Sequence, residues 1–160
     1  RLFYPQGSMA IRATIRSRKR ADGYDIDIVA EVVLPHWTPP GVVLEGLGVE
    51  GAYTPTSALA LFAAKPAALG WPHHEGQWRG NPVFISAYAD EVRAFYRGGL
   101  SDAVGWLGGN DIRYILWVRR DQDRDPTARP RIHDQIRAAY HWKPFWKNAD
   151  DELGVWIRKD

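Results

Sequence analysis

The chain has 160 residues, enough for about one domain with a buried core, and it has no cysteine, which excludes disulfides, thiolate catalysis and cysteine-based zinc sites. No apolar run approaches the roughly 20 residues that a membrane-spanning helix requires. The net charge of +2 lies entirely in residues 1–35, which carry six Lys or Arg against four Asp or Glu, whereas the remaining residues carry fifteen of each. This excess of positive charge is small, and the sequence has no nucleic-acid-binding motif, so it predicts no nucleic-acid partner.

The first predicted element is a strand at residues 24–32, Tyr-Asp-Ile-Asp-Ile-Val-Ala-Glu-Val. The period of two along a strand places the carboxylates of Asp25 and Asp27 on one face. Such a pair suits Mg²⁺, which takes one or two carboxylates and completes its octahedron with water and phosphate oxygens. Upstream, Gly7 and Ser8 could open a short helix whose free N–H groups meet a nucleotide phosphate. The alternative is that both aspartates lie on a solvated strand face without a metal.

The stretch Pro-Gln-Gly-Ser-Met, followed eighteen residues after Gly7 by Asp-Ile-Asp, closely resembles the start of the DNA polymerase beta-like nucleotidyltransferases. Within that family it is most similar to the bacterial synthases of cyclic oligonucleotide signals in antiphage defence. The resemblance implies that Gly7 and Ser8 bind the triphosphate and that Asp25 and Asp27 hold the metals. It also implies a third acidic residue on an adjacent strand, for which Glu45 and Glu50 are the only substitutes, and we expect no third carboxylate beside the pair.

Residues 35–41, Pro-His-Trp-Thr-Pro-Pro-Gly, predict a linker or turn, because three prolines and a glycine interrupt regular structure. Apolar periodicity and the start and stop signals of helices predict the elements that follow. In chain order these are a strand at 42–48, a helix at 54–64, a loop at 65–82, helices at 84–98 and 100–109, a buried strand at 111–118, a helix at 128–142 and a hairpin at 145–160.

This order of elements predicts a small α/β or α+β fold, with a small mixed sheet and helices packed mainly on one face. The strand at 111–118 is expected at the centre, with Ile115 and Trp117 buried, because its nearly unbroken apolar residues need cover on both faces. In the helix at 128–142, the helical period places Tyr140 on the same face as the buried isoleucines.

The loop predicted at 65–82 is unusual, because connections of about 15 residues without regular structure are uncommon and tend to be functional. Its two indoles offer flat apolar faces to a sugar ring or lipid head group, and its arginine offers a bidentate fork to phosphate or carboxylate. The candidate ligand-binding residues are Trp71, His74, Glu75, Gln77, Trp78 and Arg79. His74 with Glu75 could instead transfer protons, and His73 with His74 could ligate a metal. The structural alternative is that the tryptophans fix the loop to the core while Glu75 and Arg79 satisfy backbone groups.

From residue 41 onward the chain resembles the C-terminal soluble module of large polytopic bacterial and archaeal membrane proteins of the YYY-domain, glycosyltransferase-like type. Glu45 at the end of a strand, the loop at 71–80, Tyr96 at the end of a helix and Arg113-Tyr114 in a strand carry this resemblance. It implies a soluble module at the extracytoplasmic face of a bacterial membrane. The catalytic residues would lie in a parent membrane segment, so the module would not be an enzyme alone.

Two segments thus point to different functions: residues 1–34 to a nucleotidyltransferase-like fragment, and residues 41–160 to a soluble α/β module of the membrane glycosyltransferase-like type. Their combination suggests a chimera or an unusual fusion. The leading hypothesis is a module that binds a sugar-phosphate or lipid-linked glycan and needs no cofactor. The alternatives are a cytoplasmic Mg²⁺-dependent nucleotidyltransferase with a nucleotide substrate, and a non-catalytic interaction domain. Whether the chain is an enzyme stays open.

Overall fold

The computed structural model describes residues 41–47, 60 and 65–160, apart from the side chains of His74, Trp78 and Arg79. The predicted strand at 24–32, the linker at 35–40 and most of the helix at 54–64 lie outside the described residues. The same holds for the candidate site residues Gly7, Ser8, Asp25, Asp27 and Glu50.

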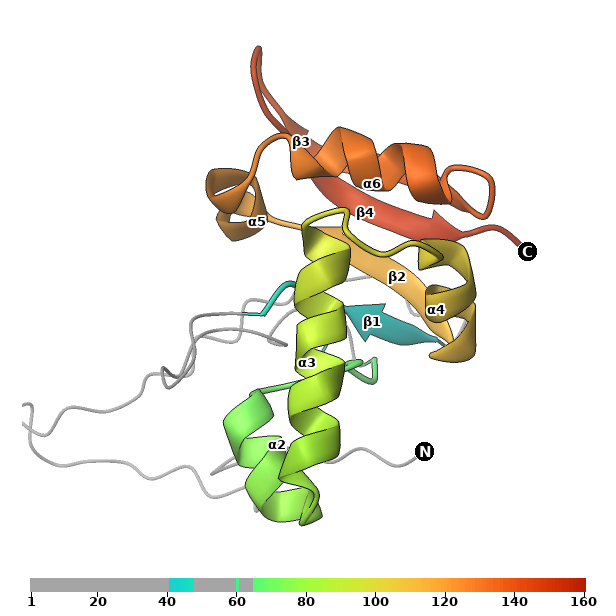
Figure 1. Ribbon diagram of the computed structural model, residues 1–160. Helices are drawn as coiled ribbons and strands as arrows, with labels where there is room; N and C mark the ends of the chain where they lie inside the picture. Colours follow the sequence, from blue (N-terminus) through green and yellow to red (C-terminus); the bar gives the residue numbers. More distant parts are fainter. Residues whose placement is uncertain (1–40, 48–59, 61–64) are drawn as a thin grey trace, which may run out of the picture.

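A mixed four-stranded sheet lies at the centre of the described part of the chain (Figure 1). Its strands are β1 (Val42–Leu44), β2 (Ile112–Trp117), β3 (Tyr140–Lys147) and β4 (Glu152–Arg158), in the spatial order β1-β2-β4-β3. β1 runs parallel to β2, whereas β4 is antiparallel to both β2 and β3. The mixed sheet confirms the predicted fold class, and β2 is an interior strand as expected.

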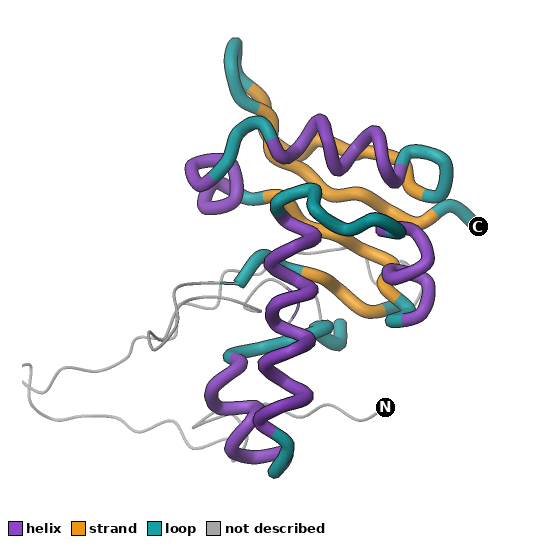
Figure 2. The backbone as a smooth tube through the Cα atoms, viewed as in Figure 1, coloured by secondary structure: helices purple, strands orange, loops and turns teal. Residues whose placement is uncertain are grey.

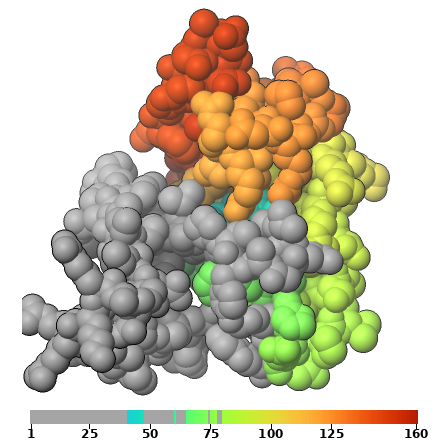
Figure 3. Space-filling model, turned by 90° about the vertical axis from the view of Figure 1, so that its left-hand side faces the viewer, coloured from blue at the N-terminus to red at the C-terminus, as the bar shows by residue number. Residues whose placement is uncertain are grey.

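The helices are α2 (Pro72–Arg79), α3 (Pro82–Tyr96), α4 (Ala103–Gly109), α5 (Arg119–Arg124) and α6 (Ala128–Ile136). Figures 1 and 2 show α3, α4 and α6 in front of the same face of the sheet, while α2 lies against the N-terminal half of α3. The connection between β3 and β4 projects beyond α6 at the top of Figures 1 and 3. Among the described residues, the helices that cover the sheet therefore lie on one face, as predicted.

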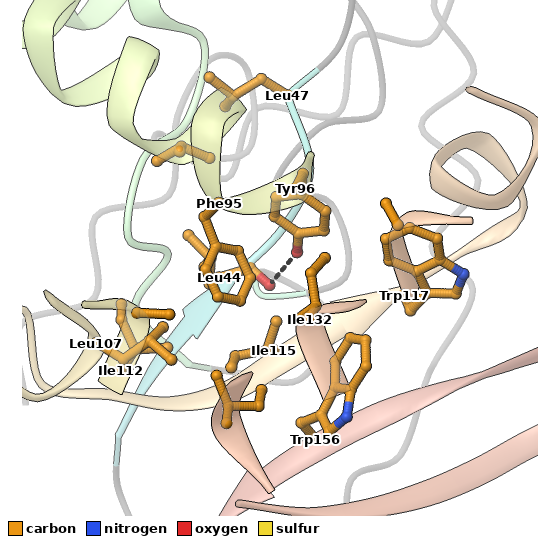
Figure 4. Close-up of a cluster of buried hydrophobic side chains, with 14 of the residues drawn as sticks. Leu44, Leu47, Phe95, Tyr96, Leu107, Ile112, Ile115, Trp117, Ile132 and Trp156 are labelled. Atoms are coloured by element: carbon orange, nitrogen blue, oxygen red, sulfur yellow. Dashed lines mark hydrogen bonds between the residues drawn. The ribbon is translucent and has the colours of Figure 1, made fainter. Parts of the chain in front are cut away.

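The core between the sheet and these helices is built from large apolar side chains (Figure 4). Ile115 and Trp117 of β2 are fully buried, which confirms their predicted position. Phe95 of α3 and Trp156 of β4 reach the same cluster, and the Trp117 and Trp156 rings meet edge to face with centroids 6.1 Å apart. A second buried cluster with Tyr114 lies against the opposite face of the sheet. β2 thus has apolar cover on both sides, as its unbroken apolar sequence requires.

The loop predicted at 65–82 is wrong in its central part, because residues 72–79 form α2. Pro72 stands in the first turn, where its missing N–H costs nothing and its fixed φ favours a helix. Gly80 ends the helix with a φ of 65°, a left-handed conformation that glycine adopts without strain. The proline and glycine that indicated a loop, Pro72 and Gly80, therefore mark the two ends of a short helix.

Two further expectations are corrected by the structure. The helix predicted at 128–142 ends at Ile136, and Tyr140 begins β3, where it pairs with Arg158 instead of continuing the helix. Tyr140 is nevertheless buried in the core, where its hydroxyl donates a hydrogen bond of 2.6 Å to the Ile112 carbonyl. Strand pairing with β4 overrides the helical period here. Helix α5 was not predicted, because its sequence Arg-Arg-Asp-Gln-Asp-Arg has no apolar periodicity.

Candidate functional site

The segment proposed to bind a ligand forms a sharp corner between two helices. α2 ends at Gly80, and Asn81 then caps α3, its side-chain Oδ1 accepting the Phe84 N–H at 3.2 Å. Gly76 faces the start of α3, where a Cβ atom would lie 3.3 Å from the Cα atom of Pro82. The small residue thus lets the two helices pack closely.

Glu75 holds the entrance of α2 in place. Its side chain is buried, and its Oε1 atom accepts a hydrogen bond from the backbone N–H of Gly70. The backbone N–H of Glu75 also donates to the carbonyl of Trp71 at 2.9 Å, so side chain and main chain close the same turn. This is the structural role weighed for Glu75, namely satisfaction of a backbone group.

The other predicted members of the site differ in what the structure shows of them. Gln77 and His73 lie one turn apart on the exposed side of α2, and their Nε2 atoms are 3.1 Å apart. Trp71 is partly buried at the start of the helix. His74, Trp78 and Arg79 lie on α2, but their side chains are outside the described part. Convergence of Trp71, Trp78 and Arg79 on one concavity therefore stays a prediction.

A second group of polar side chains lies where the parallel strands β1 and β2 end. The Tyr96 hydroxyl lies between these strands, 3.1 Å from the Leu44 carbonyl (Figure 4) and 2.7 Å from the Leu116 carbonyl. Glu45 follows β1, is buried, and accepts the Ala60 N–H at 2.7 Å through Oε1. The described candidate for a third carboxylate thus accepts a backbone hydrogen bond at one of its two oxygens.

Helix α5 contributes charged groups to the same place. Asp121 is buried, and its Oδ2 atom accepts the Val118 N–H at 3.2 Å. Arg120 donates to the carbonyl of Gly46, and Arg124 donates to the carbonyl of Leu47 at 2.9 Å. These contacts tie the segment after β1 to α5.

Burial shapes the electrostatics of this junction. Desolvation raises the pKa of the Asp121 carboxyl. The hydrogen bond from Val118 and the nearby Arg120 and Arg124 lower this pKa, but they offset the effect of burial only in part. Burial also raises the pKa of Tyr96 well above its ordinary value, with the charges of Asp121 and Glu45 adding to the shift. Tyr96 therefore remains a protonated donor. The junction connects β1, β2 and α5, and the Oδ1 atom of Asp121 is buried there without a hydrogen-bond partner.

Sequence reasoning missed this junction because its residues are far apart in the chain. The signal that could have found it is the position of Glu45 in the predicted strand at 42–48 and of Asp121 shortly after the predicted strand at 111–118, because ligand sites in α/β folds lie at the carboxyl ends of strands. Within residues 41–47, 60 and 65–160, no group of three or more His, Asp or Glu side chains could hold a metal ion. No helix in the described ranges has the length and apolar character needed to cross a bilayer.

Comparisons with known proteins give one direct indication of family. No protein-family model and no solved structure matches the chain. The cyclic dinucleotide synthase CdnG of Bradyrhizobium diazoefficiens is 41% identical over 68 residues, which cover 39% of this chain and 16% of that protein. The chain thus spans a small part of the relative that it matches. The comparisons support the nucleotidyltransferase-like resemblance, in that part of the chain is similar to a cyclic dinucleotide synthase, and they give no support to the glycosyltransferase-like one.

Proposed function

We propose that this chain carries the nucleotide- and metal-binding start of a magnesium-dependent nucleotidyltransferase of the cyclic oligonucleotide synthase type. The observation that carries the proposal is the 41% identity over 68 residues with a cyclic dinucleotide synthase. The motif of Gly7, Ser8, Asp25 and Asp27 also supports it, because these residues resemble the start of that family at its spacing.

The donor set fits magnesium. Asp25 and Asp27 offer two hard carboxylates two residues apart in a predicted strand, and Mg²⁺ takes one or two such groups with water and phosphate oxygens. Under the proposal they would hold Mg²⁺, whose charge would offset that of the triphosphate. Gly7 and Ser8 contact the phosphates through backbone N–H groups and a hydroxyl, since glycine permits close approach of the backbone.

The reaction is a nucleotidyl transfer. The 3′-hydroxyl oxygen of one nucleotide attacks the α-phosphorus of another nucleoside triphosphate, and a new P–O bond forms. The bond from the α-phosphorus to the oxygen bridging to the β-phosphate breaks, pyrophosphate leaves, and the hydroxyl proton passes to a nearby base. Asp25 and Asp27 contribute by positioning the phosphates for this in-line displacement.

Nucleotide binding and turnover test the proposal separately. The full chain is titrated calorimetrically with each of the four ribonucleoside triphosphates in the presence of Mg²⁺, and the same mixtures are assayed for pyrophosphate and for cyclic dinucleotides. We expect Mg²⁺-dependent binding that Asp25→Asn and Asp27→Asn each weaken at least about tenfold, because a neutral amide is a poorer ligand for a hard cation.

Asp22→Asn is the matched control, since Asp22 precedes the pair in the same stretch but lies outside the motif. It should bind nucleotide as the parent chain does. Absence of Mg²⁺-dependent nucleotide binding by the folded chain would contradict the proposal, as would binding that both Asp25→Asn and Asp27→Asn leave unchanged.

A further inference from the structure

We propose that a cavity between β1 and the first turns of α3 binds a small neutral aromatic molecule of one or two rings that carries an N–H or O–H donor. This site is separate from the residues of the proposed nucleotidyl transfer and does not depend on that function. The size of the cavity, the geometry of its aromatic rings and its charge support this site.

The cavity has a volume of about 270 Å³. Val42 of β1, Leu69 before α2 and Ile85 of α3 form its aliphatic wall. Engineered cavities of about 150 Å³ hold one benzene ring, and pockets for drug-sized ligands begin near 300 Å³. The volume therefore fits one or two fused rings and excludes a whole nucleotide or an oligosaccharide.

Two aromatic side chains, Phe84 and Tyr88, line the cavity. The rings of Phe84 and Tyr88 are parallel within 1°, and their centroids are 6.3 Å apart. The centroid of the Tyr88 ring is also 5.8 Å from that of the Trp106 ring. Phe84 lines the cavity and is 60% exposed, so its apolar ring faces solvent. A planar ligand would cover the Phe84 ring and gain both apolar burial and ring contact.

The polar groups of the cavity favour a ligand that donates hydrogen bonds. Asn110 lines the cavity, and its Nδ2 atom already donates to the Trp106 carbonyl at 2.8 Å. The amide oxygen is therefore the part of this side chain that can accept from a ligand. The Tyr88 hydroxyl adds a second polar group, and desolvation raises its pKa, with the charges of Glu91 and Glu75 adding to the shift.

Charge excludes anionic ligands. Among the residues that the structure describes, none that lines the cavity is Asp, Glu, Lys or Arg, and the two carboxylates that act on Tyr88 would repel an anion. A phosphate or carboxylate would lose its hydration here without gaining a cationic partner. The expected ligand is thus uncharged, in contrast to a nucleoside triphosphate.

Three probes test the chemistry of the site: indole, 1-methylindole and indole-3-acetate. Binding to the full chain is followed by ligand-observed saturation-transfer NMR and by the shift of the thermal unfolding midpoint. We expect indole to bind at millimolar concentration or below and to raise the midpoint. 1-Methylindole, which lacks the donor, should bind about tenfold more weakly, and indole-3-acetate should bind most weakly of the three because of its charge.

Two variants locate the binding. Ala68→Phe fills the cavity that Ala68 lines and should abolish indole binding while the chain stays folded. Phe84→Ala removes an exposed ring, so the fold should tolerate it, and it should weaken indole binding several-fold. Val83→Ala is the control, because Val83 is exposed beside Phe84 but does not line the cavity.

No indole binding at several millimolar by the folded chain would overturn the proposal. Binding that Phe84→Ala leaves unchanged, or equal binding of indole and indole-3-acetate, would do the same. If Ala68→Phe fails to fold, the Phe84→Ala variant and the order of the three probes still decide the outcome.

Discussion

Gly154 in β4 gives the sharpest test of the packing described above. The residue is buried, pairs with Pro144 of β3, and has a φ outside the left-handed region. Its backbone conformation is therefore open to alanine, and replacing a glycine of this kind normally stabilises a protein by about 0.4–1 kcal/mol. The structure predicts the opposite sign, because the space for a methyl group is missing.

The magnitude follows from what the new Cβ atom would meet. It would lie 2.5 Å from the carbonyl oxygen of Lys143 and 2.6 Å from the Cζ2 atom of Trp142, where ordinary contacts begin at 3.4 Å. The carbonyl belongs to the paired strand, so relief requires either separation of β3 from β4 or displacement of the indole. Overpacking of this kind costs about 1–3 kcal/mol.

Displacement of Trp142 has a further consequence. The centroid of the Trp142 ring lies 4.6 Å from that of the Trp156 ring, and the Cζ atom of Arg129 lies 5.4 Å from the Trp142 centroid. An aromatic pair is worth about 0.5–1.5 kcal/mol and an exposed cation–π contact about 0.5–1 kcal/mol. Gly154→Ala should therefore destabilise the chain by about 2–5.5 kcal/mol in total, which lowers the thermal midpoint by roughly 4–22 °C at this chain length.

The assay is urea unfolding followed by tryptophan fluorescence and circular dichroism. Gly108→Ala is the matched control, since Gly108 lies in α4 and a Cβ atom there meets no atom within 4 Å. That variant should be more stable by up to about 1 kcal/mol, because alanine favours the helix. A Gly154→Ala chain as stable as the parent would refute the inference that the Trp142 ring and the Lys143 carbonyl leave no space.

Two further predictions concern buried polar groups. His133→Ala should destabilise the fold by about 1–3 kcal/mol in urea unfolding, because the buried Trp156 indole N–H loses its acceptor, the His133 Nδ1 atom 3.1 Å away; the exposed His141→Ala serves as control, and equal effects of the two would contradict this role. Burial raises the pKa of Tyr140 to about 12, so the stability that its protonated hydroxyl provides by donating to Ile112 is complete below pH 10 and is lost as pH rises through about 12. Alkaline unfolding followed by far-ultraviolet circular dichroism should show this loss, and Tyr140→Phe should remove that part of the pH dependence; an unchanged profile would count against it.

The sequence predicted best the elements whose signal is local and strong. The unbroken apolar run at 111–118 identified β2 as an interior strand, and the terminal hairpin followed from the alternation of Val155 and Ile157 with Trp156. α3 was predicted because Ile85 and the residues three, seven and ten positions on, Tyr88, Val92 and Phe95, mark one helical face.

Prediction failed where short-range signals were ambiguous or where contacts are distant in sequence. Pro72 and Gly80 indicate a loop as readily as the two ends of a helix, and only the packing of α2 on α3 decides between them. The junction at the ends of β1 and β2 joins Glu45 to Asp121 through 76 residues of chain, which no local pattern reveals. For Gly7, Ser8, Asp25 and Asp27 the residue types and their spacing remain the basis of the prediction.

The strand order β1-β2-β4-β3 has a consequence for how the chain acquires its fold during synthesis. β4 is the most C-terminal of the described strands, yet it lies between β2 and β3, which do not pair with each other. A nascent chain that has emerged only as far as residue 147 therefore contains β2 and β3 but lacks β4, the strand that pairs with both of them. We expect such a chain to keep apolar strand edges exposed and to depend on chaperones until β4 leaves the ribosome.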